Sequence, residues 1–468
     1  MKNLLITLSA IALLQPHTNH CQEGSWYNPV AKLAIWAFST SKTSRSEHIK
    51  NARKDLTAKS YTFLHTRELK DETHNWENTI QQKITSNGNY PVIVDQTKMF
   101  FVNQDNKLEL INPQTKQTLY LSEHTVGDMN SPAHITRDES RAILCHNNFT
   151  IFDLNTNTES NVIPDISPIN WNISSNDKLV ITQQYGNRHM KLYNVDNGAL
   201  TTSFKSQENV QSAHFKNNDT QVVLPGAEGI ETWNLETQQK LSTIKNFQED
   251  DLVYNRKAQL ANNKSILIAQ QGYMRETNGN PWTQQYVNIY DLNKNTHVKT
   301  VNALNESATS FCVNPEGTSV AVACISDAKN GFIRIQSLVD DAQITLEGPG
   351  DQVYALCYTK DGRLVSAGTN GIVQIWNPIN GDCIKTYTYK TDKHAAFATM
   401  LDTNNQVLLH SFKNTPDNEL YNARIIQLDT GDVVFSANES LPVNVAADSS
   451  MLAVTHSDHS IYTVTPLK

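Results

Sequence analysis

Residues 353–389 read VYALCYTKDGRLVSAGTNGIVQIWNPINGDCIKTYTY, and this stretch decides the fold. It holds four short runs in which apolar residues alternate with other residues, a pattern typical of half-buried β-strands. The turns Lys360-Asp361-Gly362 and Thr369-Asn370-Gly371 separate the first three runs. Asp-Gly and Asn-Gly tolerate positive φ and are the strongest short-range signals of a hairpin. The stretch therefore predicts four antiparallel strands joined by tight turns.

The end of the third run, Trp376-Asn377-Pro378, has counterparts along the chain. In each of them, a residue that is usually apolar or aromatic precedes a polar residue and then Pro, Leu or Val. Nine such triplets occur: Ile111-Asn112-Pro113, Phe152-Asp153-Leu154, Tyr193-Asn194-Val195, Trp233-Asn234-Leu235, Tyr290-Asp291-Leu292, Gln336-Ser337-Leu338, Trp376-Asn377-Pro378, Ile426-Gln427-Leu428 and Val464-Thr465-Pro466. Their first residues are separated by 41, 41, 40, 57, 46, 40, 50 and 38 positions. A period of about 40 residues indicates a repeat architecture.

Four antiparallel strands in each period describe one blade of a β-propeller, in which sheets repeat around a central channel. The same strand order fits Ile169–Lys205 and Val210–Ile244. We therefore expect an all-β chain in which residues 89–468 form a single β-propeller. Counting units gives nine four-stranded blades, and eight blades with one irregular unit is the alternative. A β-sandwich is disfavoured because it would not repeat one triplet nine times.

Two of the triplets carry a resemblance to the WD-repeat family, whose units end their third strand in Trp-Asp. They are Trp233-Asn234 and Trp376-Asn377, and the stretch Leu356–Trp376 is similar to a family unit along almost its whole length. Asn370 stands at the turn position where the family usually has Asp. The family's Gly-His dipeptide is absent from every unit, so its buried Asp–His–Ser–Trp hydrogen-bond network is not implied. Bacterial propellers with a Tyr-Val-Thr-Asn signature are a close alternative.

The N-terminus has a different character. A lysine at position 2 precedes an apolar stretch from Leu4 to Leu14, which is typical of a secretory signal peptide and too short to span a bilayer. We expect residues 1–21 to be this signal and the protein to be exported, to the periplasm or the medium. No A-x-A-like cleavage site follows. The alternative is therefore an apolar helix packed on the domain of a cytoplasmic protein.

Residues 22–88 are expected to form a short helical lead-in to the propeller. Apolar residues recur there at helical spacing in two sets, Ile49, Ala52 and Leu56 and then Trp76, Ile80 and Ile84. A competing interpretation concerns the last unit, Val443–Leu467, which has only three strands. In that interpretation Thr79–Thr85 supplies the fourth strand and closes the ring, which hides two open edges.

Composition excludes several functions. The net charge is −8, and no long basic run occurs, so nucleic acid is not expected as a partner. No other apolar stretch is long enough for a transmembrane helix. The motifs G-x-S-x-G, H-E-x-x-H, G-x-x-x-x-G-K-[ST] and G-x-G-x-x-G are all missing. We therefore expect no enzyme and no cofactor.

No metal site is expected either. His456-Ser457-Asp458-His459 falls where a turn between second and third strands is expected, and Glu249-Asp250-Asp251 lacks the spacing of a calcium loop. The six cysteines form no C-x-x-C pair, so neither a zinc site nor a disulfide framework is indicated. Cys312 and Cys324 flank one turn, and a single disulfide between them stays open.

The long intervals between triplets point to a binding site. The 57-residue interval contains an insertion, Gln270–Tyr286, between the second and third strands of its unit; the insertions Ser411–Asn422 and Ser326–Gly331 have the same position in other units. Loops at this position all leave a propeller on one face, and loops on rigid scaffolds often carry function. The first insertion holds residue types that dominate binding hot spots, namely Tyr273, Met274, Arg275, Trp282 and Tyr286.

The resemblance implies a non-enzymatic scaffold, and we expect these five residues of a monomeric propeller to bind a protein or peptide partner. The alternative for the insertion is that Trp282 packs on its own loop. The alternative for the function is an exported propeller enzyme, or a small-ligand binder, that uses the central channel. Such a protein should bring charged residues or histidines from several first strands together. The predicted first strands are largely apolar or amide, with His134 and His214 as exceptions.

Overall fold

The structure is a computed structural model of the 468-residue chain. It describes residues 79–466, with gaps at 86–87, 104, 126–133, 146–148, 164–167, 185–187, 208–209, 211, 227, 246–252, 262–263, 278–279, 303–305, 327–330, 348–351, 369–370, 390–393, 401–405, 415–418, 439, 446–451 and 457–460. The chain divides into two units, and the larger one, 61–275, 283–413 and 420–468, holds almost all of these residues. The smaller unit contributes only the ends of four strands to the described backbone. The expected signal peptide and most of the expected helical lead-in lie outside the described residues.

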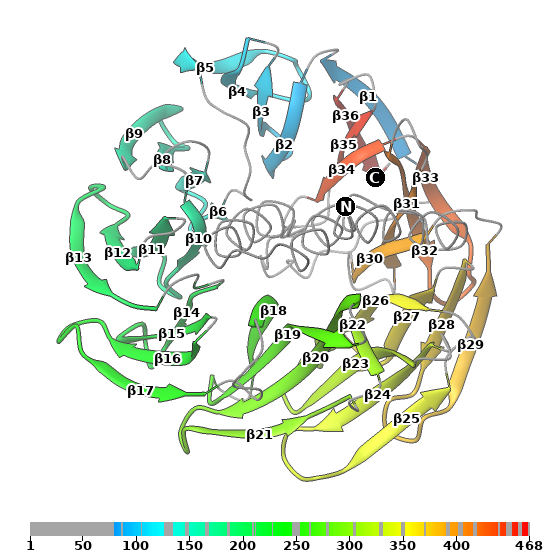
Figure 1. The fold of residues 1–468 in the computed structure, drawn as a ribbon. Helices are drawn as coiled ribbons and strands as arrows, with labels where there is room; N and C mark the ends of the chain where they lie inside the picture. The colour runs from blue at the N-terminus through cyan, green and yellow to red at the C-terminus, as the bar shows by residue number, and fades with distance from the viewer. Residues whose placement is uncertain are drawn as a thin grey trace, which may run out of the picture. The chain divides into compact units, whose positions relative to one another are not determined.

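The described residues form 36 β-strands in nine four-stranded antiparallel sheets, with no helix among them (Figure 1). We call the sheets blades 1 to 9 in chain order. Blades 1 to 3 contain β2 (Gly88–Asp95), β3 (Lys98–Asn103), β4 (Lys107–Ile111) and β5 (Thr118–Thr125); β6 (His134–Ile135), β7 (Arg141–Cys145), β8 (Phe149–Asp153) and β9 (Thr158–Ile163); and β10 (Pro168–Ile173), β11 (Leu179–Gln184), β12 (His189–Asn194) and β13 (Leu200–Lys205).

Blades 4 to 6 continue the same order. They contain β14 (His214–Lys216), β15 (Gln221–Gly226), β16 (Gly229–Asn234) and β17 (Lys240–Ile244); β18 (Val253–Ala261), β19 (Ile266–Thr277), β20 (Asn280–Asp291) and β21 (Thr296–Thr300); and β22 (Glu306–Val313), β23 (Ser319–Ser326), β24 (Gly331–Ser337) and β25 (Gln343–Glu347).

Blades 7 and 8 contain β26 (Val353–Tyr358), β27 (Leu364–Gly368), β28 (Ile372–Trp376) and β29 (Cys383–Thr388), and then β30 (His394–Met400), β31 (Gln406–Asn414), β32 (Glu419–Gln427) and β33 (Val433–Asn438). Blade 9 differs because its four strands are not consecutive. It contains β34 (Ser440–Val445), β35 (Leu452–His456), β36 (Ile461–Pro466) and β1 (Thr79–Thr85). The predicted all-β propeller with eight or nine four-stranded blades is confirmed.

Successive blades pack face to face through apolar side chains. Phe100 of blade 1 meets Phe152 of blade 2 edge to face, with ring centroids 4.9 Å apart. Phe149 meets Trp171 of blade 3 in the same way at 5.3 Å. Aromatic pairs of this geometry add about 0.5–1.5 kcal/mol to the area that they bury. Further shared clusters link blades 3 and 4, 4 and 5, 5 and 6, 6 and 7, and 7 and 8.

β1 closes the array, and this corrects the helical interpretation of Ile80 and Ile84. β1 pairs with β36 from Thr79 opposite Pro466 to Thr85 opposite Ile461. A spacing of four residues fits one face of a helix and also one face of a strand, so the pattern alone could not decide. The free edge of β36 decides it, because an unpaired edge leaves backbone groups without partners. The competing interpretation, a ring-closing strand, is therefore confirmed.

The structure explains the nine triplets. The polar residue in the middle caps the turn between third and fourth strands, as in the Asx turn where Asp153 Oδ1 accepts from Asn155 N at 2.8 Å and Thr156 N at 3.0 Å. In five blades the residue after it donates its backbone N–H to the end of the first turn of the same blade. Leu154 N donates to Ser140 O at 2.8 Å, and Val195, Leu235, Leu292 and Leu338 repeat the bond. These five triplets thus tie the two turns of their blade together, whereas triplets that end in proline have no N–H for this bond.

A β-bulge recurs in the outermost pair of strands. Seven blades shift register between their third and fourth strands just before the capping residue, at Leu110/Ile111, Ile151/Phe152, Leu192/Tyr193, Thr232/Trp233, Ile289/Tyr290, Ile375/Trp376 and Ile425/Ile426. A bulge at a sheet edge increases local twist and hinders pairing with another edge. The repeat therefore protects its outer strands. No helix long and apolar enough to cross a membrane occurs in the part of the chain that the structure describes.

Candidate functional site

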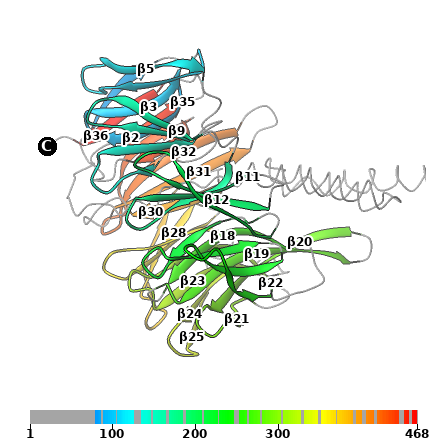
Figure 2. The same ribbon diagram turned by 90° about the vertical axis from the view of Figure 1, so that its left-hand side faces the viewer.

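The insertion Gln270–Tyr286 forms longer strands, where an enlarged loop was expected. β19 and β20 have 12 residues each, and only Asn278 and Gly279 lie between them (Figure 2). The same holds for the insertion in blade 8, where β31 and β32 have nine residues each. Asn-Gly between two strands favours a two-residue hairpin. Asn278-Gly279 is such a pair, so the sequence itself carries the signal for a longer hairpin.

The β19–β20 hairpin of blade 5 extends farther than the strands β18 and β21 that flank it. β18 follows β19 as far as the pair of Val253 with Tyr273. On the other side, β21 follows β20 only from Asn288 to Asp291. The ends of β19 and β20 near the Asn-Gly turn therefore extend past the described register of both flanking strands.

A network of buried amides fixes the base of this hairpin. Gln271 Oε1 accepts from Asn288 Nδ2 at 2.7 Å and from Tyr290 OH at 2.5 Å, and both amide side chains are fully buried. Gln270 Nε2 donates to Gln285 Oε1 and to the carbonyl oxygen of Ala308 in blade 6, both at 2.9 Å. Buried polar groups that are satisfied in this way hold one geometry, because any other arrangement leaves them unpaired.

The side chain of Asn302 forms hydrogen bonds with the backbone of β20. Its Oδ1 accepts from Val287 N at 3.0 Å, while its Nδ2 donates to Gln285 O at 3.0 Å and to Glu306 O at 2.9 Å. Glu306 in turn accepts two hydrogen bonds from the guanidinium of Arg334, one of them from Nη2 at 2.7 Å. Bidentate charge-assisted pairs of this kind are stronger than neutral hydrogen bonds. The hairpin base is thereby tied to blade 6.

The five predicted contact residues fall into two groups. Tyr286 is fully buried in β20. In the free protein its side chain is therefore part of the hairpin base and is not exposed for contact with a partner. Tyr273, Met274, Arg275 and Trp282 lie in β19 and β20 toward the hairpin turn, and their side chains are outside what the structure describes. The amides that hold the base, Gln270, Gln271, Asn288 and Asn302, were missed. Their residue type is common in this chain and gives no signal of burial.

Three first strands carry chemically active groups. Lys257 on β18 has an exposed side chain, and its Nζ donates to Phe311 O at 3.0 Å and lies 4.7 Å from the centre of the Phe311 ring. Desolvation by the surrounding protein lowers its pKa. Cys312 on the neighbouring β22 is a free thiol whose pKa burial raises to about 12.

His214 and His134, the two histidines noted in first strands, have different roles. His214 on β14 is half-buried, its Nε2 lies 3.0 Å from Ser212 Oγ, and burial lowers its pKa to about 4. His134 Nε2 instead contacts Asp177 Oδ1 of the next blade at 3.0 Å. Asp177 Oδ2 also accepts from Arg137 N at 2.7 Å, so this contact joins two blades.

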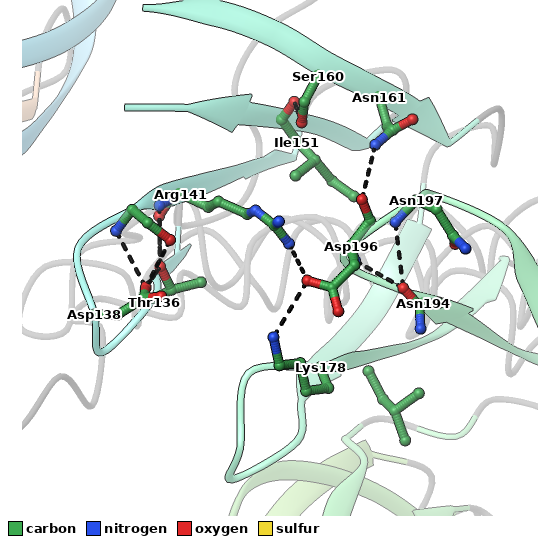
Figure 3. A network of polar contacts seen from close by, with 12 residues as sticks. Thr136, Asp138, Arg141, Ile151, Ser160, Asn161, Lys178, Asn194, Asp196 and Asn197 are labelled. Atoms are coloured by element: carbon green, nitrogen blue, oxygen red, sulfur yellow. Dashed lines mark hydrogen bonds and ion pairs between the residues drawn. The ribbon is translucent and has the colours of Figure 1, made fainter. Parts of the chain in front are cut away.

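Similar contacts join the turns of blades 2 to 4. In Figure 3, Arg141 of blade 2 and Lys178 of blade 3 both point to the carboxylate of Asp196, with Lys178 Nζ 3.3 Å from Oδ1. The hydrogen bond from Arg141 lowers the pKa of Asp196. Asp219 of blade 4 accepts from Ser175 Oγ at 2.7 Å. These acidic groups stabilise blade junctions, and no cluster of metal ligands is present among the described residues.

The disulfide left open by the sequence does not form. Cys312 lies opposite Ala321, whereas Cys324 lies opposite Ala308, so the two cysteines are not cross-strand partners. Both are free, as are Cys357 and Cys383.

Comparison with known proteins supports the repeat class. No family model matches the chain. The WD repeat-containing protein RUP2 of Arabidopsis thaliana is 38% identical over 71 residues, which are 15% of this chain and 19% of the relative. The chain thus spans about a fifth of that protein's length. This match and the nine four-stranded sheets fit the same class of fold. The chain is a WD-repeat-like β-propeller.

Part of the WD-repeat hydrogen-bond network is present in this WD-repeat-like propeller. Trp376 Nε1 donates to Ser366 Oγ at 2.9 Å, which is the Ser–Trp half of the network. At the equivalent position of blade 4, Trp233 Nε1 donates to Glu231 Oε2 at 2.8 Å, and this carboxylate also accepts from Ser206 Oγ at 3.0 Å. The third strand is therefore anchored through its indole in both blades, by different acceptors.

We predict that Asn302→Ala destabilises the propeller by about 1–3 kcal/mol, because Val287 N and Gln285 O would lose the side chain to which they are hydrogen-bonded. Urea denaturation followed by tryptophan fluorescence measures the change. The control is Asn155→Ala, at an exposed turn position, which should change the free energy of unfolding by less than about 0.5 kcal/mol. Equal effects of the two substitutions would show that Asn302 is dispensable.

A second prediction concerns pH. The pKa of His214 is about 4 in the folded protein, against an ordinary value of 6.5. The unfolded chain therefore binds the proton first, and the free energy of unfolding falls as the pH drops from 6.5 to 4. Denaturation at several pH values should show a shallower fall for His214→Gln than for the wild type. Asn155→Ala, which removes no titratable group from an exposed position, should keep the wild-type slope. An unchanged slope in His214→Gln would contradict the prediction.

Proposed function

We propose that this WD-repeat-like propeller is a non-enzymatic scaffold that binds a protein or peptide partner through the β19–β20 hairpin. One observation carries the proposal: the hairpin extends past its neighbouring strands while buried amides fix its base. A rigid protruding element loses little conformational freedom on binding, and such preorganisation favours affinity. Tyr273, Met274, Arg275 and Trp282 are the proposed contacts, because Trp, Tyr and Arg dominate hot spots.

The relative named above supports this proposal at the level of architecture alone. Its printed description says that it contains WD repeats, and propellers of this kind commonly present surfaces for binding. The lack of catalytic motifs in the sequence points in the same direction.

Shortening the hairpin tests the proposal. A variant that lacks residues 274–277 and 280–283 keeps the Asn-Gly turn and the amide network. The matched control removes residues 411–414 and 419–422 from the β31–β32 hairpin of blade 8. We expect affinity capture to recover the same partners with the wild type and the control and to lose them with the β19–β20 variant. Circular dichroism and thermal melts confirm folding of each variant.

Recovery of identical partners by all three proteins would show the proposal to be wrong. Single substitutions sharpen the result. Arg275→Ala and Trp282→Ala should each weaken a captured partner by roughly tenfold or more if they are hot spots.

A second candidate function, binding of a small ligand near the axis, is supported by one observation. Lys257 presents an exposed amino group on a first strand, where it donates to a backbone carbonyl oxygen and no carboxylate pairs with it among the described residues. A small anion such as succinate would gain a charge-assisted hydrogen bond there.

Titration calorimetry with succinate tests this candidate. We expect Lys257→Met to bind roughly tenfold more weakly than the wild type, as loss of a charged hydrogen bond implies. Lys205→Met, at an exposed position of β13, should bind like the wild type. Absence of binding to the wild type, or equal binding to Lys257→Met, would exclude this function.

A further inference from the structure

Two turns between third and fourth strands differ from their counterparts in the other blades. Val339 in blade 6 and Ile379 in blade 7 both lie two positions after the capping residue, and they are 71% and 85% exposed. No other large apolar side chain among the described residues is as exposed. The equivalent residues of six other blades are all polar, namely Gln114, Asn155, Asp196, Glu236, Asn293 and Asp429.

The two apolar side chains are held outward by capped backbone. Ser337 Oγ accepts from Val339 N at 3.2 Å, and Asn377 Oδ1 accepts from Ile379 N at 3.0 Å. Both residues are branched at Cβ, which restricts χ1. Their exposure is therefore a property of an ordered turn, and binding would cost little conformational entropy.

The two turns are neighbours in space. A Cβ added to Gly381, in the blade 7 turn, would lie 3.2 Å from Ile344 Cγ2 and 3.3 Å from Leu346 Cδ2. Ile344 and Leu346 belong to β25, which starts directly after the blade 6 turn. The turn that carries Ile379 thus rests on the strand that follows Val339. Gly381 adopts φ +83°, a conformation that residues with a side chain rarely adopt, and it approaches β25 more closely than most Cβ contacts.

The surroundings of these turns are acidic. Asp340 and Asp341 follow Val339, and Asp382 ends the other turn; all three are exposed. The first turns of the same blades leave their sheets on the same side and add the exposed carboxylates of Glu316 and Asp361. Two cations lie in the first turn of blade 7, namely the exposed Lys360 and Arg363, whose Nε already pairs with Asp361 at 2.8 Å.

We propose that this acidic–apolar surface, formed by Val339, Ile379, Asp340, Asp341 and Asp382, docks a partner segment with two apolar side chains flanked by lysine or arginine. Two ordered aliphatic side chains surrounded by acidic groups fit an apolar centre with a charged rim of opposite sign. Nucleic acid and anionic membranes carry the wrong charge. A second copy is disfavoured as well, because the same surface would set carboxylates opposite carboxylates.

The acidic–apolar surface is separate from the proposed hairpin site. In a four-stranded antiparallel sheet, turns between third and fourth strands leave on the side opposite to turns between second and third strands. The β19–β20 turn is of the second kind, so a test of the acidic–apolar surface stands or fails independently of the proposed function.

The test uses the full chain and a fluorescein-labelled peptide in which two leucines and a tryptophan lie between pairs of lysines. Fluorescence anisotropy at low salt should show saturable binding that weakens as salt is added, because exposed charges are screened. The double variant Val339→Ser/Ile379→Ser should bind at least about tenfold more weakly. Asp340→Asn/Asp341→Asn should weaken binding and reduce its salt dependence.

The matched control is Leu200→Ser/Val298→Ser, which changes two outer-strand residues that are each 54% exposed. It should bind the peptide like the wild type, and a peptide with glutamates in place of the lysines should not bind. Three results would overturn the proposal: no saturable binding by the wild type, equal binding by the Val339→Ser/Ile379→Ser variant, or equal binding of the glutamate peptide. Because both substituted residues are exposed, the variant is expected to fold.

Discussion

Contact between neighbouring sheets is the constraint on which the whole structure depends. A four-stranded sheet with apolar residues on both faces, such as blade 4 with Val222 on one face and Val223 on the other, cannot bury them by itself. Each blade is therefore stable only between two others. The array has no natural end, and the pairing of β1 with β36 is what joins its first segment to its last. Each blade is thus held between two neighbours. Its capped turns, its bulged outer strand and the contacts between turns add to the stability of this arrangement.

The regularity of the scaffold makes its departures informative. In most turns between third and fourth strands the second residue after the cap is polar, and among the described residues only blades 6 and 7 place an exposed aliphatic side chain there. Most strands are short, and only blade 5 extends its central hairpin to 12 residues per strand. Its base is held by Gln271, Asn288 and Asn302, so buried amides add here to the apolar packing that blade 5 shares with its neighbours.

Much of the fold could be predicted from sequence because its signals are local. Asp361-Gly362 and the nine triplets specify turns through residue types that tolerate positive φ or cap a backbone amide. β1 was ambiguous because Ile80 and Ile84 fit both periods, and its partner lies at the other end of the chain. For the candidate site, the sequence could predict only where along the chain it lies. The 57-residue interval located the hairpin, but residue type could not show that Tyr286 is buried or that Gln270 bonds to blade 6. Those facts depend on contacts between segments distant in sequence.

Ring closure by β1 also determines when the ring can close during synthesis of the chain. Thr79 pairs with Pro466, so 466 − 79 = 387 residues separate the two partners in sequence. At the usual 5–20 residues per second, roughly 20 to 80 seconds pass between the emergence of the first partner and the second. During this time β1 has no strand to pair with, and a chain that stops short of β36 cannot close. Synthesis of β36 is therefore a condition for the finished ring.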